Sequence, residues 1–152
     1  MIYLDNAATS FPKPKRVYDR MDQFLREEAA NPGRSGHRLS VAAEAQIVQA
    51  RSLLAKLFNV KQSERIIFTL NCTDSLNIAI KGALKEGDHV ITTYLEHNSV
   101  LRPLNALEAI GKISMTKVKP HGEGFIDPAE IKKAIKKNTK LIAMTHASNV
   151  IG

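Results

Sequence analysis

The chain of 152 residues has a single cysteine, no tryptophan and few other aromatic residues. The lone Cys72 excludes an internal disulfide framework and is typical of a protein of the reducing cytoplasm. No apolar run is long enough to span a bilayer, and the first residues lack the basic and apolar regions of a signal peptide. These absences predict a cytoplasmic protein that has no membrane partner.

Two kinds of ligand-binding signature are also missing. Neither G-x-G-x-x-G nor G-x-x-x-x-G-K-[ST] occurs, which argues against an ordinary dinucleotide site and a P-loop. His37, His89 and His121 have no ligand spacing with other histidines, cysteines or paired acids, so we expect no metal site.

Basic residues outnumber acidic ones, with 22 Lys and Arg against 15 Asp and Glu, a formal net charge of +7. This excess suits an acidic partner, and a non-catalytic basic module that binds nucleic acid is one candidate function. Aromatic residues make up only 5% of the chain, however, so base stacking and a nucleic-acid partner are not expected. Several lysines also alternate with apolar residues, as on the solvated face of a helix: Lys132, Lys133, Lys136, Lys137 and Lys140.

The hydrophobic pattern alternates between short β-like runs and segments with helical spacing. Apolar residues at helical intervals predict helices over 15–29, 40–57, 76–87, 100–111 and 128–137. Runs rich in β-branched residues predict strands over 65–70, 89–94, 113–118 and 140–147. This alternation predicts an α/β fold with a mostly parallel sheet covered by helices.

Polar clusters follow three of the predicted strands. Asn71-Cys72-Thr73 follows the first, Glu96-His97-Asn98 the second, and His146-Ala147-Ser148-Asn149 the last. Because the carboxyl ends of parallel strands meet at one edge of a sheet, where ligands bind, we expect the clusters to form one site.

Each cluster also has a purely structural interpretation. Thr73, Asp74 or Ser75 could cap the helix that begins there, whereas the alternative is that the unpaired amides and the Thr73 hydroxyl hold an anion such as phosphate.

The other candidates carry the same ambiguity. His97 could be an ordinary surface residue, His146 could be buried within the sheet, and Asn149 could be a turn residue. Cys72 has no evident base beside it in the sequence and is interpreted as a small loop residue rather than a nucleophile.

Five ordered motifs resemble one enzyme family: "YLDNAATSFPKP", "NPGRSGHRLS", "IIFTLNCTDSLNIAI", "YLEHNSVLRP" and "THASNVIG". Together they resemble the class V aminotransferase group of pyridoxal-phosphate enzymes, and most closely the cysteine desulfurase and selenocysteine lyase branch. The resemblance covers residues 1–152 and implies the N-terminal part of the large domain of a fold type I enzyme, usually a homodimer.

The resemblance implies roles for the positions that match. Backbone amides and a hydroxyl at Cys72 and Thr73 would bind the cofactor phosphate. His97 would stack on the pyridine ring and assist proton transfer, and Asn149 would lie beside the phenolic oxygen of the cofactor. The "LDNAAT" segment would lie near the active-site entrance. The loop departs from the family at Asn71-Cys72, where two hydroxyl residues or a glycine are common.

The implied reaction removes sulfur from L-cysteine and leaves alanine and an enzyme-bound persulfide, which a sulfur-acceptor protein could receive. The Schiff-base lysine, the aspartate and arginine of the site and the sulfur-accepting cysteine of the family would lie beyond residue 152, so we expect an N-terminal fragment that is inactive alone. A catalytically inactive fold type I scaffold remains an alternative, and the motifs do not separate cysteine from selenocysteine as the substrate.

Overall fold

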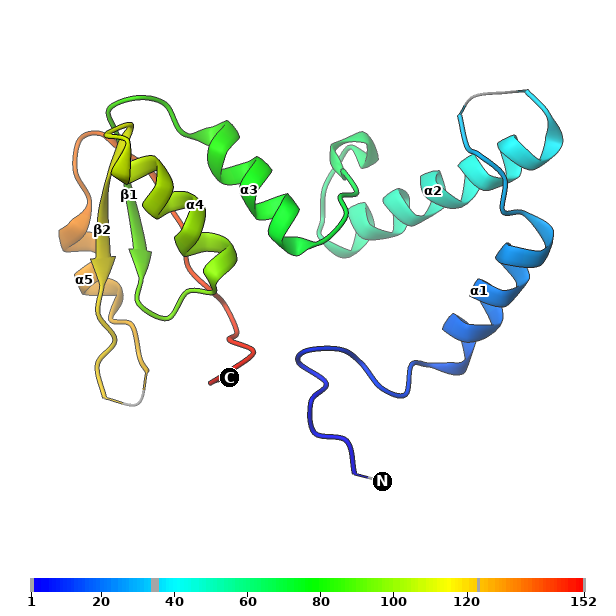
Figure 1. The fold of residues 1–152 in the computed structure, drawn as a ribbon, viewed down its shortest axis with the longest axis horizontal. Coiled ribbons are helices and arrows are strands. Elements are labelled where there is room, and N and C mark those ends of the chain that lie inside the picture. The colour runs from blue at the N-terminus through cyan, green and yellow to red at the C-terminus, as the bar shows by residue number, and fades with distance from the viewer. Residues whose placement is uncertain (1, 34–35, 123, 152) are drawn as a thin grey trace. The chain divides into compact units, whose positions relative to one another are not determined.

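The computed structural model describes residues 2–33, 36–122 and 124–151. Its elements follow one another along the chain as Figure 1 shows. They form two units, Met1–Phe68 and Thr69–Gly152, each of which is considered by itself.

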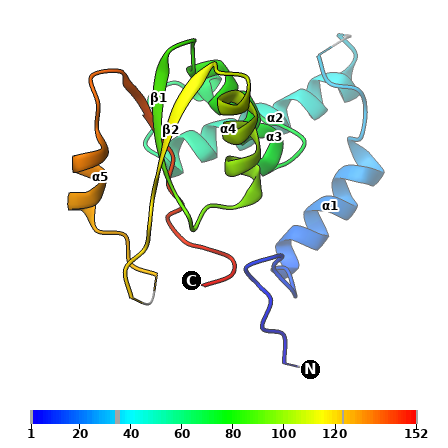
Figure 2. The ribbon, with the colours of Figure 1, turned by 60° about the vertical axis from the view of Figure 1, so that its left-hand side comes forward.

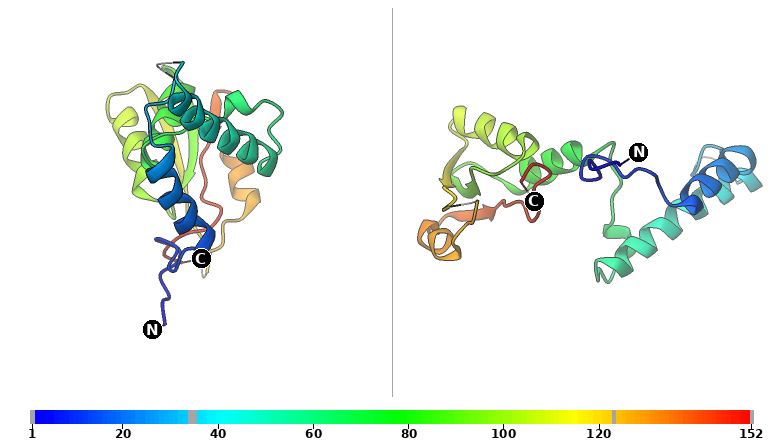
Figure 3. Two further views of the ribbon diagram at one scale, coloured as in Figure 1. Left: turned by 90° about the vertical axis from the view of Figure 1, so that its right-hand side faces the viewer. Right: turned by 90° about the horizontal axis from the view of Figure 1, so that it is seen from below.

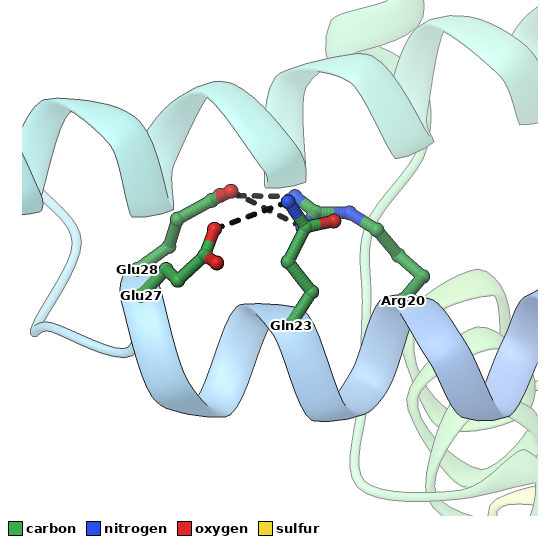
Figure 4. Close-up of polar contacts among 4 residues, drawn as sticks. All are labelled: Arg20, Gln23, Glu27 and Glu28. Atoms are coloured by element: carbon green, nitrogen blue, oxygen red, sulfur yellow. Dashed lines mark hydrogen bonds and ion pairs between the residues drawn. The ribbon is translucent and has the colours of Figure 1, made fainter.

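The first unit begins with helix α1 (Lys15–Glu27). Arg20 reaches forward to Glu28, just past the end of the helix, and its two terminal nitrogens donate to the carboxylate at 3.1 and 2.9 Å (Figure 4). This hydrogen-bonded ion pair raises the pKa of the Arg20 guanidinium. Gln23 adds a bond to Glu27, so the last turns of α1 are tied together by side chains.

Helix α2 (Arg38–Leu57) occupies the longer helical region predicted from the sequence. His37 caps it by accepting a hydrogen bond from the Ser40 amide at 3.2 Å. Apolar residues along this helix are buried at Ala43 and Ala55 and half-buried at Leu54, whereas Leu57 at its end is 74% exposed. Burial of the apolar stripe is therefore lost at the last residue of the helix.

The predicted strand over 65–70 is not formed. Ser63–Arg65 is a short 3-10 helix, and the residues after it pair with no strand among the described residues. Ile66 has an extended backbone, but Ile67 is 76% exposed and Leu70 90% exposed. The β-branched composition was therefore not enough, because a strand also requires a hydrogen-bonded neighbour.

The second unit contains helices α3 (Cys72–Ala83), α4 (Asn98–Ala109) and α5 (Pro128–Ala134). Strands β1 (Asp88–Thr93), β2 (Ile113–Val118) and β3 (Thr139–Ile142) form a parallel sheet in the order β2-β1-β3. Figures 2 and 3 show α4 and α5 on opposite sides of this sheet. The predicted α/β fold with a helix-covered parallel sheet is confirmed.

The core of this unit lies between the sheet and the pair α3 and α4. Its buried members come from both helices and from two strands: Ile80, Leu84, Val90, Val100, Leu104, Leu107 and Ile113. Leu84, directly after the end of α3, is buried, whereas Ala83, the last residue of the helix, is exposed.

Two predicted elements are shorter than expected. The lysine-rich helix α5 begins as predicted, with Asp127 as its cap, but ends at Ala134 because the chain then becomes extended at Ile135. The Thr139 hydroxyl accepts the Lys136 amide at 2.7 Å and so stabilises the turn into β3. The lysines are thus spread over a helix, a turn and a strand.

Strand β3 ends at Ile142, whereas a strand through residue 147 was predicted. Its alternate residues are exposed, as in a strand with one face open to solvent, and it lies at the edge of the described sheet. In the part of the chain that the structure describes, no helix is long and apolar enough to cross a membrane.

Candidate functional site

The start of α3 is capped by Asn71, not by Thr73, Asp74 or Ser75 as the structural interpretation proposed. The Asn71 side chain accepts the amide of Asp74 at 2.9 Å, and its carbonyl accepts the amide of Ser75 at 3.1 Å. Asn71 has an extended backbone, as the residue before a helix usually does, and asparagine is among the best capping residues. The cap was missed although an asparagine before a run of helical spacing is its usual signal.

This cap leaves two amides at the helix start. The first amides of a helix have no intrahelical acceptor, and those of Cys72 and Thr73 have none among the described residues. The Thr73 hydroxyl likewise makes no hydrogen bond to a described residue. Two amides, one hydroxyl and the positive end of a 12-residue helix form a suitable set of donors for an anion.

His97 caps the neighbouring helix α4. Its Nδ1 accepts the amide of Ser99 at 3.1 Å and lies 2.8 Å from the Ser99 hydroxyl. A ring nitrogen that accepts an amide proton carries none itself, so the neutral imidazole bears its proton on Nε2. The ring is exposed. His97 is therefore both a helix cap and an available donor at Nε2.

Thr73 and His97 line the same groove. This groove, with a volume of about 400 Å³, runs between α3 and α4 and also contains Lys81 and Arg102. Neither cation forms an ion pair with an acid among the described residues. The structure thus brings two of the predicted site residues together in a groove with excess positive charge.

The other predicted residues lie elsewhere. Cys72 is an exposed free cysteine at the first position of α3, and its side chain does not line the groove. Asn149 is exposed in the turn that follows β3 and does not line it either. His146 is exposed rather than buried within the sheet, and it borders a separate cavity of about 200 Å³ together with Thr145.

A buried carboxylate connects two of the predicted clusters. Glu96 lies between β1 and α4, directly before His97, and is 8% exposed. Its Oε1 accepts the Thr93 hydroxyl at 2.8 Å and the Thr145 amide at 2.9 Å. Sequence reasoning named Glu96 only as part of a polar cluster. The hydroxyl of Thr93, three residues before Glu96, could have indicated the first of these bonds. The bond to Thr145 could not be predicted without the fold.

His89 is buried in β1 and contacts both neighbouring strands. Its Nδ1 lies 2.8 Å from the Thr139 hydroxyl in β3, and its Nε2 lies 2.8 Å from the Thr116 hydroxyl in β2. Burial, and then the charge of Lys136, lower the pKa of His89. The described residues contain no group of His, Cys, Asp and Glu that could hold a metal ion.

Known proteins similar to this chain belong to one family. Residues 2–152 match the family model of class V aminotransferases. The chain is 43% identical to cysteine desulfurase IscS of Dictyoglomus turgidum, covering 99% of this chain and 38% of that protein. It is similar to the apo structure of cysteine desulfurase from Thermococcus onnurineus NA1, with a TM-score of 0.87 and 35% identity over 97% of this chain and 37% of that one.

A third relative is a structure of SspA in complex with cysteine, with a TM-score of 0.86 and 35% identity over 98% of this chain and 43% of that one. The chain spans about 38% of the length of the curated relatives that it matches. Since the family model covers nearly all of the sequence, the chain belongs to the class V aminotransferase family.

Proposed function

We propose that the complete protein is a pyridoxal-phosphate-dependent cysteine desulfurase, which removes sulfur from L-cysteine and leaves alanine and an enzyme-bound persulfide. Family membership and the cysteine desulfurases among its relatives support this activity. A relative solved in complex with cysteine supports the substrate. The observation that carries the proposal is the pair of free amides at Cys72 and Thr73, next to a groove shared by Thr73 and His97.

The residues present fit the phosphate of pyridoxal phosphate. A phosphate dianion accepts several hydrogen bonds, and the start of α3 offers the amides of Cys72 and Thr73 and the Thr73 hydroxyl. Lys81 and Arg102 in the groove favour an anion electrostatically. Thr73 is the better supported phosphate ligand of the two, because its side chain adds a donor and lines the groove, whereas Cys72 offers its backbone amide.

His97 and Asn149 would orient the rest of the cofactor. His97 offers a flat ring for stacking, and its Nε2–H can donate to the cofactor or substrate while Nδ1 stays engaged with the Ser99 amide. Asn149 has an amide group that can donate to a phenolic oxygen. When bound, pyridoxal phosphate supplies an electron sink for bond cleavage at the amino acid.

The proposal extends to the partners of the complete protein. We assign it a homodimeric state, a cytoplasmic location and a sulfur-acceptor protein that receives the persulfide sulfur, as is usual for the family. Analytical ultracentrifugation of the complete protein measures the first of these directly.

The activity is tested by adding pyridoxal phosphate and L-cysteine to the complete protein and measuring alanine. Alanine formed in proportion to bound cofactor supports the proposal. The phosphate assignment is tested separately by comparing pyridoxal phosphate with pyridoxal, which lacks the phosphate and should bind far more weakly. Equal affinity for the two compounds would contradict the phosphate site, and no alanine from fully loaded protein would contradict the activity.

A further inference from the structure

Glu96 lies where three segments of the second unit meet. It follows β1, it directly precedes His97, and it contacts the segment that leads from β3 to Asn149. Only 8% of its surface is exposed, which is unusual for a carboxylate unless hydrogen bonds compensate the loss of water.

The contact between these segments is made largely by side chains. After β3 ends at Ile142, the Ala143 amide still donates to the Ile91 carbonyl at 2.9 Å, and the Thr92 hydroxyl donates to the Ala143 carbonyl at 3.0 Å. Two residues further on, the Thr145 amide donates to Glu96 rather than to a strand. Among the described residues, Glu96 therefore provides the last hydrogen bond from the β1 side before the chain turns toward Asn149.

The same oxygen also stabilises the loop that carries His97. The Thr93 hydroxyl donates to Glu96 Oε1 and in turn accepts the Leu95 amide at 3.1 Å. One buried charge thus holds the loop before α4 on one side and the main chain at Thr145 on the other. Bonds to an ionised acceptor are stronger than neutral ones, and more so where water is excluded.

We propose that Glu96 is a positioning residue that fixes the segment of Thr145 and Asn149 against the loop of His97, so that both side chains are held ready for one cofactor. The inference rests on the proposed function, because it assigns His97 and Asn149 to a common ligand. It adds a role for a residue that touches neither the groove nor, in the described structure, Asn149 itself.

The test compares Glu96→Ala and Glu96→Gln in the complete protein by two measurements, hydrogen exchange of the Thr145 amide without cofactor and the Kd for pyridoxal phosphate. Loss of a charge-assisted bond corresponds to about 10- to 100-fold faster exchange. We expect this increase in Glu96→Ala, together with a weaker Kd. Glu96→Gln keeps an acceptor oxygen and the side-chain shape, so it should fall between the wild type and Glu96→Ala in both measurements.

Glu108→Ala is the matched control. Glu108 also accepts a backbone amide, that of Met115 at 3.0 Å, but it joins α4 to β2 and does not line the groove. Its removal should speed exchange at Met115 and leave the Kd unchanged.

Unchanged exchange at Thr145 in Glu96→Ala would overturn the proposal, as would faster exchange with a wild-type Kd. If Glu96→Ala does not fold, Glu96→Gln decides the question. A Thr145 exchange rate and a Kd that both equal those of the wild type would show that the charge of Glu96 does not position the segment. Failure of the wild type to bind pyridoxal phosphate would instead contradict the proposed function, and the exchange data would still decide whether Glu96 holds the segment.

Discussion

At the scale of single residues, the side chain that caps α3 differs from the one proposed to bind the cofactor phosphate. The Asn71 side chain accepts the Asp74 amide, whereas the Thr73 hydroxyl makes no hydrogen bond to a described residue. The two functions can therefore be removed independently, by one substitution each.

Thr73→Val keeps the shape of the side chain and removes one phosphate donor. A hydrogen bond to a charged group is worth roughly 1.5–3 kcal/mol, so the Kd for pyridoxal phosphate in the complete protein should rise by one to two decades. The stability without cofactor should stay the same. Asn71→Ala is the converse variant, because loss of a cap lowers the free energy of unfolding by about 1 kcal/mol. A Thr73→Val protein with wild-type affinity would show that this hydroxyl is not a phosphate ligand.

His97 caps α4, and substitution can separate this role from its proposed role in proton transfer. Asparagine can replace the histidine as a helix cap but offers no imidazole, so His97→Asn should retain stability and lose turnover by about 10²- to 10⁴-fold, the usual contribution of a positioned acid or base. His97→Ala should lose both, since it no longer accepts the Ser99 amide. Thermal unfolding and alanine formation per folded molecule are the two measurements. If both variants lost stability equally and kept wild-type alanine formation per folded molecule, His97 would have only the capping role.

At the scale of elements, His89 connects all three strands of the described sheet through two hydroxyls. Because burial and Lys136 lower its pKa in the folded state, the unfolded chain takes up a proton first as the pH falls. Stability should thus be constant above the unfolded pKa of about 6.5 and should decrease as the pH falls from there toward the folded pKa.

Urea midpoints between pH 5 and pH 8 measure this dependence. Below a pH of about 6.5, the urea midpoint of His89→Gln should depend less on pH than that of the wild type, because the contribution of His89 is gone. His121→Gln removes an exposed histidine and should keep the wild-type pH dependence. A slope that is the same in the wild type and His89→Gln would contradict the assignment.

Local sequence signals predicted the elements that are stabilised locally. The strand over 113–118 and the start of α5 at Pro128 are confirmed, because strand-forming runs and the Asp127 cap act within a few residues. The strand expected over 65–70 is wrong because a strand also needs a partner, and composition does not specify one. The end of α5 was missed because the Thr139 side chain, which accepts the Lys136 amide, lies beyond the periodic pattern.

The same distinction applies to the site. Topology alone predicted that clusters after parallel strands would lie at one edge, and Thr73 and His97 do share a groove. The contact from Glu96 to Thr145 spans 49 positions and depends on the strand order, so no local sequence pattern predicts it. The roles of Cys72, Thr73, His97 and Asn149 toward a cofactor stay predictions that ligand-binding experiments must test.

At the scale of the whole molecule, apolar residues are distributed in an unusual way. Among the described residues, 25 large hydrophobic side chains are exposed and 11 hydrophobic residues are buried. Single exposed apolar residues are ordinary, but contiguous ones mark surfaces that associate. Ile67, Phe68 and Leu70 form such a run in a segment that has no strand partner among the described residues.

We therefore expect the polypeptide of these 152 residues, prepared by itself, to dimerise or aggregate rather than remain a monomer. Extended backbone with unpaired amides and apolar side chains is a template for association with another chain. Light scattering across a dilution series measures this directly. Ile67→Glu should reduce association because it places a charge in the exposed run, whereas Gln62→Glu adds the same charge at an exposed polar position and should have little effect. A compact monomer with a cooperative unfolding transition at every concentration would contradict the expectation, because the exposed run would then be tolerated in water without any partner.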